Sequence, residues 1–501
     1  MKNQASTWKK YLFLGTQATI FCCLAIALRL PFQSQILHEW DSVQFALALD
    51  NFDIRLHQPH PPGMFVIYIF LGRLLHLFMA DANASLVWLS TLSAGLATAT
   101  MFLFTTTWFG RQTGLITALL MLASPLVWFQ GEVALSYMLE FFWTLLIVWG
   151  CFYLRYGNKF AFYSSTILLG LAGGIRPNTL FFLAPLWLVA FFLGLRSNKY
   201  QIKHFFIALF LGLIAVACWF LPLVMMSGGF PEYWQAMQPW LNKHPQDGVG
   251  RSFQGVYLNF KMLVEALLYG LGFGLIPLIW LLRRQGKQII SQWRYDWRLQ
   301  TLILWIIPGF CYLLLVHIQR LGHTFTILPA LIIVAGWATY RAMRELELSK
   351  PKSAVVLLFL ILIGNGLFFL LFPGKLDNIP VWQTIRDYDL QISERVQLIR
   401  QEFISEETLV ITRGRNSRIR EFYLPEYTGS SRLYEPGKET EILPANLRNL
   451  VLFEDRVMSK LNPDSGYQTL QLPTTGEIRY FSWSENEQVT LSKNQVEIKQ
   501  P

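Results

Sequence analysis

The segment from His38 to Gly63 holds the residues whose types and spacing best suit chemistry. It contains Glu39-Trp40-Asp41, and the Ala/Leu-rich run after Asp41 predicts a short helix at a membrane surface with the carboxylate at its start. A carboxylate there can accept the proton of an attacking hydroxyl, a general-base role worth about 10² to 10⁴ in rate. Asp41-Ser42-Val43-Gln44 also fits a capping box, in which Asp41 satisfies backbone N–H groups of its own helix. The sequence leaves both roles open.

The run His60-Pro61-Pro62-Gly63 predicts a rigid turn ahead of the apolar segment 64–78, because each proline fixes φ and the glycine permits a sharp bend. His57 and His60 flank this turn, although a turn by itself needs no histidine. Both are candidates for holding a phosphate or orienting the carboxylate, and a purely structural turn is the simpler interpretation.

A second polar loop contains Glu132 and Tyr137, and Glu140 follows about one helical turn inside the next apolar segment. Acids are costly to bury in a membrane, so both carboxylates are candidates for function. Together with Glu39, Glu132 and Tyr137 are candidates for a second acid or an acceptor-binding group. The alternative for Glu132 is a solvated loop residue.

Positive side chains occupy two further loops. Arg176, in Gly174-Ile175-Arg176-Pro177, suits a phosphate because a guanidinium binds oxygens bidentately and keeps its charge. The alternative is an interfacial residue that snorkels to the lipid headgroups. His317, Arg320 and His323 bring three potential cations to one short turn, which predicts a second phosphate-sized positive site or, as the alternative, ordinary membrane-interface decoration.

The chain that positions these residues is too apolar for one water-soluble core. Of its 501 residues, 53% are hydrophobic and only 15% are charged, which favours a polytopic α-helical membrane protein. Segments long enough to cross a bilayer predict about eleven transmembrane helices. They cover residues 11–30, 86–108, 113–128, 136–154, 160–174, 179–195, 205–226, 257–281, 299–316, 324–340 and 353–373.

Threading these spans from a cytoplasmic N-terminus places the short basic loops inside, as the positive-inside rule requires. Residues 31–85, 130–136 and 228–256 then lie outside, and the odd number of spans exports the C-terminus. The candidate residues sit at the outer ends of their spans, and none lies clearly at mid-membrane. Chemistry at the outer face is therefore favoured over transport.

A second domain is expected after Pro373, where charged residues become frequent. Alternating residues at 407–412 and 449–453 predict strands, and 382–403 has apolar residues at helical spacing. We therefore expect residues 1–373 to form a transmembrane domain and residues 374–501 a small extracytoplasmic α/β or α+β domain. No catalytic motif stands out in the latter.

Other classes of function fit the sequence less well. The net charge of +10 does not indicate nucleic-acid binding, because no Lys/Arg-rich run is interleaved with aromatic residues. The five cysteines lie in apolar stretches without ligand-type spacing, so neither a disulfide nor a zinc site is expected.

These motifs resemble those of the GT-C superfamily of glycosyltransferases, in the branch that holds protein O-mannosyltransferases, aminoarabinose transferases and RgtA/B/C/D-like bacterial enzymes. The motifs concerned are Glu39-Trp40-Asp41, His60-Pro61-Pro62-Gly63, Glu132 with Tyr137, Gly174-Ile175-Arg176-Pro177 and residues 317–329. The resemblance implies a polyprenyl- or dolichyl-monophosphate sugar as donor and Asp41 as the matching catalytic base. Two departures leave the sugar and the acceptor open: many relatives place paired acids together where this chain has Glu39-Trp40-Asp41, and Gly63 replaces a leucine after the prolines.

On this resemblance Asp41 deprotonates an acceptor hydroxyl, whose oxygen displaces the lipid phosphate from the anomeric carbon with inversion. The side chains expected to neutralise that phosphate are His60, Arg176, His317, Arg320 and His323, so that no metal and no organic cofactor are required. The expected partners are membrane lipid, a polyprenyl-phosphate donor of a hexose or pentose, and a lipid, glycan or protein acceptor. The expected location is a plasma membrane. The missing C-terminal retention signal favours a bacterial one slightly, and the sequence leaves an endoplasmic reticulum membrane open. A lipid or solute transporter and a membrane scaffold with an exported binding domain are the alternatives.

Overall fold

The computed structural model describes residues 2–246, 252–349, 351–373, 380–412, 415–430, 441–454, 466–485, 487–492 and 495–499. The chain divides into two compact units. The first consists of Met1–Gln33 and Ala48–Gln383, and the second of Ser34–Leu47 and Thr384–Pro501. Residues 34–47, which the sequence assigned to the transmembrane domain, thus group with the C-terminal residues.

The first unit carries the membrane-spanning helices. Among the described residues, eight helical segments are long and apolar enough to cross a bilayer. They are Lys9–Phe32, Ala82–Phe109, Tyr137–Leu154, Pro177–Arg196, Ile202–Met226, Phe253–Gln292, Trp297–Leu315 and Lys352–Leu371. The chain is accordingly a multi-pass membrane protein, as its composition predicts.

Three of the predicted spans take other forms. Residues 113–128 form two helices, α5 (Arg111–Ala123) and α6 (Pro125–Gln130), because Pro125 starts a new helix behind the cap Ser124. Residues 160–174 form α8 (Lys159–Ala172), which has 14 residues. Residues 324–340 begin in a short 3-10 helix, η4 (Leu321–Thr326), before α15 (Leu328–Ser349). The number of eleven spans stays a prediction.

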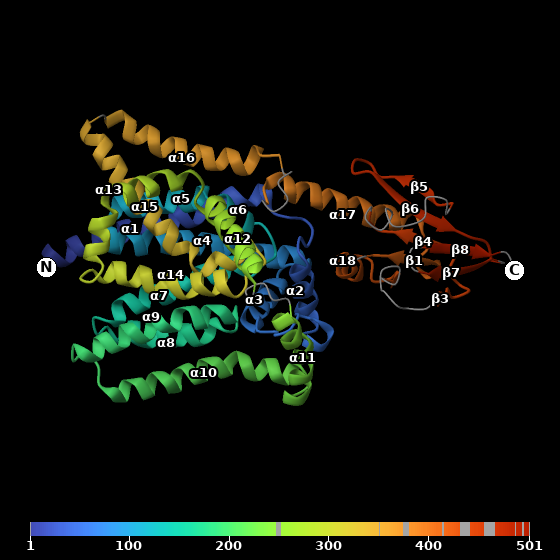
Figure 1. Ribbon diagram of the computed structural model, residues 1–501, viewed down its shortest axis with the longest axis horizontal. Coiled ribbons are helices and arrows are strands. Elements are labelled where there is room, and N and C mark those ends of the chain that lie inside the picture. Colours follow the sequence, from blue (N-terminus) through green and yellow to red (C-terminus); the bar gives the residue numbers. More distant parts are fainter. Residues whose placement is uncertain are drawn as a thin grey trace. The chain divides into compact units, whose positions relative to one another are not determined.

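The remaining helices of the first unit are as follows. The long ones are α1 (Lys2–Arg29), α4 (Ala82–Phe109), α7 (Tyr137–Leu154), α9 (Pro177–Arg196), α10 (Ile202–Met226), α12 (Phe253–Leu271), α13 (Leu275–Gln292), α14 (Trp297–Leu315) and α16 (Pro351–Leu371). The short ones are η1 (Leu30–Phe32), η2 (Ile54–Leu56), α3 (Val66–His76), α11 (Phe230–Gln246) and η3 (Gly272–Gly274). The helices α7, α8 and α9 lie side by side, and α10 packs against α8 (Figure 1).

Helix α4 contacts α1, α5 and α7, and its buried positions are rich in Ser, Thr, Ala and Gly. Small residues let membrane helices approach closely. Gly95 shows this, because a Cβ there would lie 2.9 Å from Ile26 of α1.

The second unit contains α2 (Trp40–Asp50) up to Leu47, most of α17 (Trp382–Glu402), η5 (Ser405–Glu407), α18 (Arg415–Tyr423) and two sheets. The larger sheet has the order β2-β1-β4-β6-β5, with β1 parallel to β2 and β4, and β6 antiparallel to β4 and β5. Its strands are β1 (Thr408–Ile411), β2 (Thr428–Ser430), β4 (Asn449–Leu452), β5 (Gln468–Gln471) and β6 (Glu477–Ser482). A smaller antiparallel sheet joins β3 (Glu441–Ile442), β7 (Gln488–Ser492) and β8 (Gln495–Lys499).

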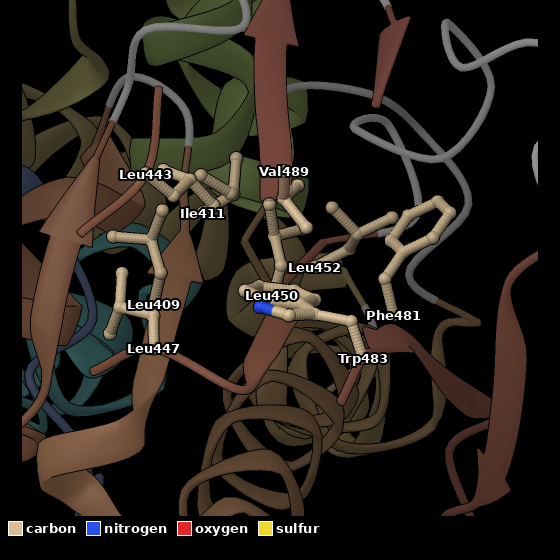
Figure 2. Packing of buried hydrophobic residues seen from close by; sticks show 9 residues of the cluster. All are labelled: Leu409, Ile411, Leu443, Leu447, Leu450, Leu452, Phe481, Trp483 and Val489. Carbon is tan, nitrogen blue, oxygen red and sulfur yellow. The ribbon is translucent and has the colours of Figure 1, made fainter. Parts of the chain in front are cut away.

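Leucine, isoleucine and aromatic side chains of both sheets form one core, shown in Figure 2. It includes Leu409 and Ile411 of β1, Leu450 and Leu452 of β4, and Val489 of β7. The strand β1 is buried along its whole length, as expected for a strand with parallel neighbours on both sides. The strands predicted at 407–412 and 449–453 and the helix predicted at 382–403 are confirmed.

Candidate functional site

The turn before α9 places Arg176. Its backbone is extended at the N-cap of α9, where Pro177 supplies the fixed φ of the first helical residue. The preceding Gly174 packs on Trp219, since a Cβ at Gly174 would lie 2.7 Å from the indole. The carbonyl of Gly174 accepts a hydrogen bond of 2.8 Å from the backbone N–H of Ile67, in α3. The Arg176 turn is thus fixed against both α10 and α3.

The guanidinium of Arg176 is held on three sides within the first unit. Its Nε lies 3.2 Å from Oε2 of Glu140, and its Nη1 donates a 3.2 Å hydrogen bond to the hydroxyl of Ser136. Its Cζ lies 4.3 Å from the centre of the Tyr137 ring, within the range of a cation–π contact. The side chain is 12% exposed, so the snorkelling interpretation is wrong. Arg176 is directed into the protein because Glu140 attracts it there.

Glu140 serves as the counter-charge of Arg176. It is 2% exposed, and its Oε1 accepts hydrogen bonds from the hydroxyls of Thr179, at 2.6 Å, and Thr326, at 3.3 Å. These contacts connect α7 with α9 and with η4. A buried carboxylate with these partners suits an orienting role for Arg176 better than a catalytic one.

The turn that precedes and includes η4 brings His323 against Tyr137 and His317 against His323. The rings of Tyr137 and His323 are 6.1 Å apart, and those of His323 and His317 are 5.9 Å apart. Gly322 permits this packing, because a Cβ there would lie 2.6 Å from the Tyr137 ring.

His323 differs from the expected cation. Burial lowers the pKa of His323 well below its usual value, and the positive charges of Arg176 and Arg320 and the nearby His317 lower it further. Its Nδ1 accepts a 3.4 Å hydrogen bond from the backbone N–H of Gln319, which leaves the ring proton on Nε2. At neutral pH His323 is therefore an uncharged hydrogen-bond donor, and Arg176 and Arg320 carry the positive charge.

The predicted proline turn is confirmed. Gly63 has a φ of +70°, which glycine adopts readily, and its N–H donates a 2.9 Å hydrogen bond to the carbonyl of His60. The His60 ring is 5.3 Å from that of Phe65, whose ring in turn lies 5.9 Å from Cζ of Arg176. His60 is thus connected to Arg176 through one aromatic side chain.

These contacts form a continuous series of basic and aromatic side chains, which we call the Arg176 row. Its members are His60, Phe65, Arg176, Tyr137, His323 and His317. The structure therefore brings together four of the five predicted phosphate-binding residues, and the fifth, Arg320, lies near enough to His323 to affect its pKa.

Glu132 lies apart from this row. It is 0% exposed, so the solvated-loop interpretation is wrong. The Glu132 carboxylate interacts electrostatically with the guanidinium of Arg29, the last residue of α1. Arg29 is also 0% exposed, and its side chain packs on Gly131. The loop is buried because its carbonyls at Gly131 and Leu135 accept hydrogen bonds from Thr91 and Ser90 of α4.

Glu39 and Asp41 belong to the second unit. The helix α2 begins at Trp40, so the predicted helix is confirmed and Asp41 lies in its first turn. The predicted capping box with Asp41 as the N-cap is wrong, because the residue before the helix is Glu39, two positions earlier. The backbone N–H of Glu39 donates to the hydroxyl of Ser42 at 3.3 Å, which makes Glu39 the residue before the helix. The Asp41 carboxylate is partly exposed.

An apolar cavity of about 160 Å³ lies beside η4. It is enclosed by α12, α14, η4 and α15, and the residues that line it include Leu263, Ala266, Phe310, Thr324, Ile327 and Leu331. Thr324, which lines this cavity, is the neighbour of His323 in the chain.

The fold of this chain is similar to that of solved GT-C glycosyltransferases. Two crystal structures of ArnT, an aminoarabinose transferase from Cupriavidus metallidurans, share it, one bound to undecaprenyl phosphate and one in the apo state. Their TM-scores are 0.53 and 0.54 at 12% sequence identity, over 95% of this chain and 98% of theirs. An oligosaccharyltransferase from Archaeoglobus fulgidus, in complex with zinc and sulfate, has a TM-score of 0.48 at 14% identity, over 93% of this chain and 73% of its own. No family model and no curated protein matches the sequence.

Sequence reasoning missed several residues that the structure connects to the candidates. Arg29 could have been identified from the sequence, because a charged residue in an apolar span is energetically costly and indicates a functional or paired position. Ser136 and Thr326 could not, because a hydroxyl at a helix end is common and its partner is set only by the packing of three helices.

Proposed function

We propose that this protein is a membrane glycosyltransferase that takes its sugar from a polyprenyl-phosphate donor. The observation that carries the proposal is the Arg176 row, a set of basic and aromatic side chains around one oriented guanidinium, in a chain with the GT-C fold. Arginine suits a phosphate because its planar donors match phosphate oxygens and its charge does not titrate.

In the proposed reaction Asp41 accepts the proton of an acceptor hydroxyl, and the hydroxyl oxygen forms a bond to the anomeric carbon of the donor sugar. The bond between that carbon and the phosphate oxygen breaks, and the configuration inverts. The donor is a phosphodiester with one negative charge, and the departing monophosphate gains a second. Arg176 and Arg320 stabilise this developing charge, and the Nε2–H of His323 donates a hydrogen bond to it in this proposal; the support is that Nδ1 of His323 already accepts from the backbone.

The orientation of Arg176 supports this role. Glu140 and Ser136 fix the guanidinium before any ligand binds, so little side-chain entropy is lost when a phosphate arrives. The partial burial of the group also strengthens its interaction with an anion, because the local dielectric is lower than that of water.

The apolar cavity beside η4 suits the lipid part of the donor. A polyprenyl chain is a hydrocarbon, and each methylene that leaves water for such a space contributes about 0.8 kcal/mol. We further propose that the reaction takes place at the extracytoplasmic face of a plasma membrane, with the N-terminus inside, the second unit outside and no required metal. The charge pattern of the loops supports this orientation.

The experiment is to purify the protein in detergent and to measure the release of polyprenyl phosphate from a panel of polyprenyl-phosphate hexoses and pentoses. The test variant is Asp41→Asn. The matched control is Asp50→Asn, which removes an exposed carboxylate from the last residue of the same helix. We expect release by the wild type and the control, and a loss of about 10² to 10⁴ in the rate with Asp41→Asn at unchanged donor binding.

A folded wild type that releases no polyprenyl phosphate from any donor contradicts the proposal. Release that is equally fast with Asp41→Asn contradicts the assignment of the base alone.

A further inference from the structure

The segment immediately before Asp41 is held by one carboxylate of the C-terminal part of the chain. In α17, Asp389 accepts hydrogen bonds from three consecutive residues of this segment. The donors are the hydroxyl of Ser34 at 2.9 Å, the backbone N–H of Gln35 at 2.7 Å and the backbone N–H of Ile36 at 3.2 Å. Hydrogen bonds to a charged acceptor are among the stronger ones in proteins, so this set fixes the backbone of the segment.

Two aromatic residues extend these contacts to the next two positions. The hydroxyl of Tyr423, at the end of α18, accepts a 2.9 Å hydrogen bond from the backbone N–H of Leu37. The ring of Tyr388 lies 4.7 Å from that of His38. Each residue from Ser34 to His38 thus contacts α17 or α18, and we call residues 34–38 the held segment.

The helix that carries Asp389 is itself fixed to the sheets of the second unit. Arg395, which is 1% exposed, donates a 2.7 Å hydrogen bond to the carbonyl of Phe453 after β4. The carboxylate of Glu394 accepts from the backbone N–H of Thr475 at 3.0 Å. The hydroxyl of Tyr427 donates to the carbonyl of Phe403 at 2.9 Å. Asp389 is therefore a fixed point of a folded domain.

The held segment leads directly into α2. Glu39 follows it, and the N–H of Glu39 bonds to Ser42 at the start of the helix. Asp41 lies in the first helical turn, so the course of the backbone at residues 34–38 determines where this turn begins and how it is directed. A displacement of about 1 Å at a reacting group can lower a rate about 10²-fold.

We propose that Asp389 is a positioning residue for Asp41, and that the C-terminal domain thereby takes part in catalysis without touching the substrate. This inference rests on the proposed function, in which Asp41 is the base. Asp389 acts through the held segment: it keeps the first turn of α2 in place, and Asp41 accepts the proton.

The experiment compares the full-length wild type with Asp389→Ala and with the control Asp387→Ala. The control removes an exposed carboxylate from the same helix. Two quantities are measured in detergent: the hydrogen–deuterium exchange of the peptide that covers residues 34–38, and kcat and KM for release of polyprenyl phosphate from the donor found active.

We expect the backbone amides of the held segment to exchange about tenfold faster or more in Asp389→Ala than in the wild type. We expect its kcat to fall about tenfold or more while KM for the donor stays within about twofold, because donor contacts are untouched. Asp389→Asn keeps one acceptor oxygen, so its kcat should lie between those of the wild type and Asp389→Ala. Asp387→Ala should match the wild type in both measurements.

Tyr423→Phe provides a second, milder variant in case Asp389→Ala does not fold. It removes the acceptor for the Leu37 N–H, and it should speed hydrogen exchange at that position and lower kcat about two- to fivefold. An active enzyme whose kcat is unaffected by both Asp389→Ala and Tyr423→Phe overturns the inference and leaves the proposed function standing. A wild type without transferase activity overturns both.

Discussion

Replacing Glu140 by glutamine is expected to destabilise the membrane unit by about 3 kcal/mol. The carboxylate is 2% exposed and lies 3.2 Å from Nε of Arg176, whose own side chain is 12% exposed. Breaking a buried ion pair by removing one partner typically costs about 3 to 5 kcal/mol, because the other charge is left without compensation. We take the lower end, since glutamine keeps an oxygen that can accept from Thr179 and Thr326. This is about a 150-fold change in the folding equilibrium.

The assay is reversible unfolding of the purified protein in mixed micelles, followed by tryptophan fluorescence. The matched control is Glu345→Gln, which breaks the ion pair of Glu345 with Arg284 on an exposed surface, where such pairs are worth about 0 to 1 kcal/mol. The double variant Glu140→Gln/Arg176→Gln should recover about 2 kcal/mol relative to the sum of the single variants, because the lone buried charge is gone. The reasoning is refuted if Glu140→Gln is as stable as Glu345→Gln.

Three further outcomes follow from the same structure. Arg176→Lys should lower kcat/KM about 10- to 100-fold, because a lysine keeps the charge and loses the planar donors; polyprenyl-phosphate release measures this, and an unchanged value would contradict the role of Arg176. Gly322→Ala should cost about 1 to 3 kcal/mol in unfolding experiments, since its Cβ would lie 2.6 Å from the Tyr137 ring, whereas Gly286→Ala, with open space around it, should not destabilise. Burial raises the pKa of Asp389 from 3.8 to about 6, so the stabilisation from its protonation is complete below about pH 4 and is lost as the pH rises through 6. Relative to Asp389→Asn, the free energy of unfolding of the wild type should therefore fall by up to about 3 kcal/mol over this pH range. If the unfolding free energies of the two proteins run parallel with pH, this titration of Asp389 is excluded.

The parts of the fold that depend on local patterns could be predicted from the sequence. The spacing of apolar residues in α17 and the alternation in β1 and β4 reflect burial of one face, which each segment encodes by itself. The helix after Asp41 follows from the same rule. Its cap was misplaced because serine, aspartate and glutamate near a helix start can satisfy its N–H groups in more than one register.

The site was predictable in its residue types and less so in its connections. Arg176 and the 317–323 turn stood out because positive groups are unusual at helix ends that the predicted topology places on the outer face. The neutral state of His323 could not be seen, since it depends on burial and on the charge of Arg176 from another helix. The Asp389 contacts were also hidden, because Ser34 and Asp389 are 355 residues apart and neither belongs to a recognisable motif.

The assignment of residues 34–47 to the second unit limits how this chain can be recombined with relatives. An exchange of the C-terminal domain at a single junction near residue 374 would carry Asp389 and Tyr423 away from the residues that they bind. A productive chimera must therefore exchange two separate stretches together, the short one before and within α2 and the long one from α17 onward. The two stretches fold as one structural unit although they are separated in the sequence. Substitutions in one stretch should therefore be accompanied by compensating substitutions in the other.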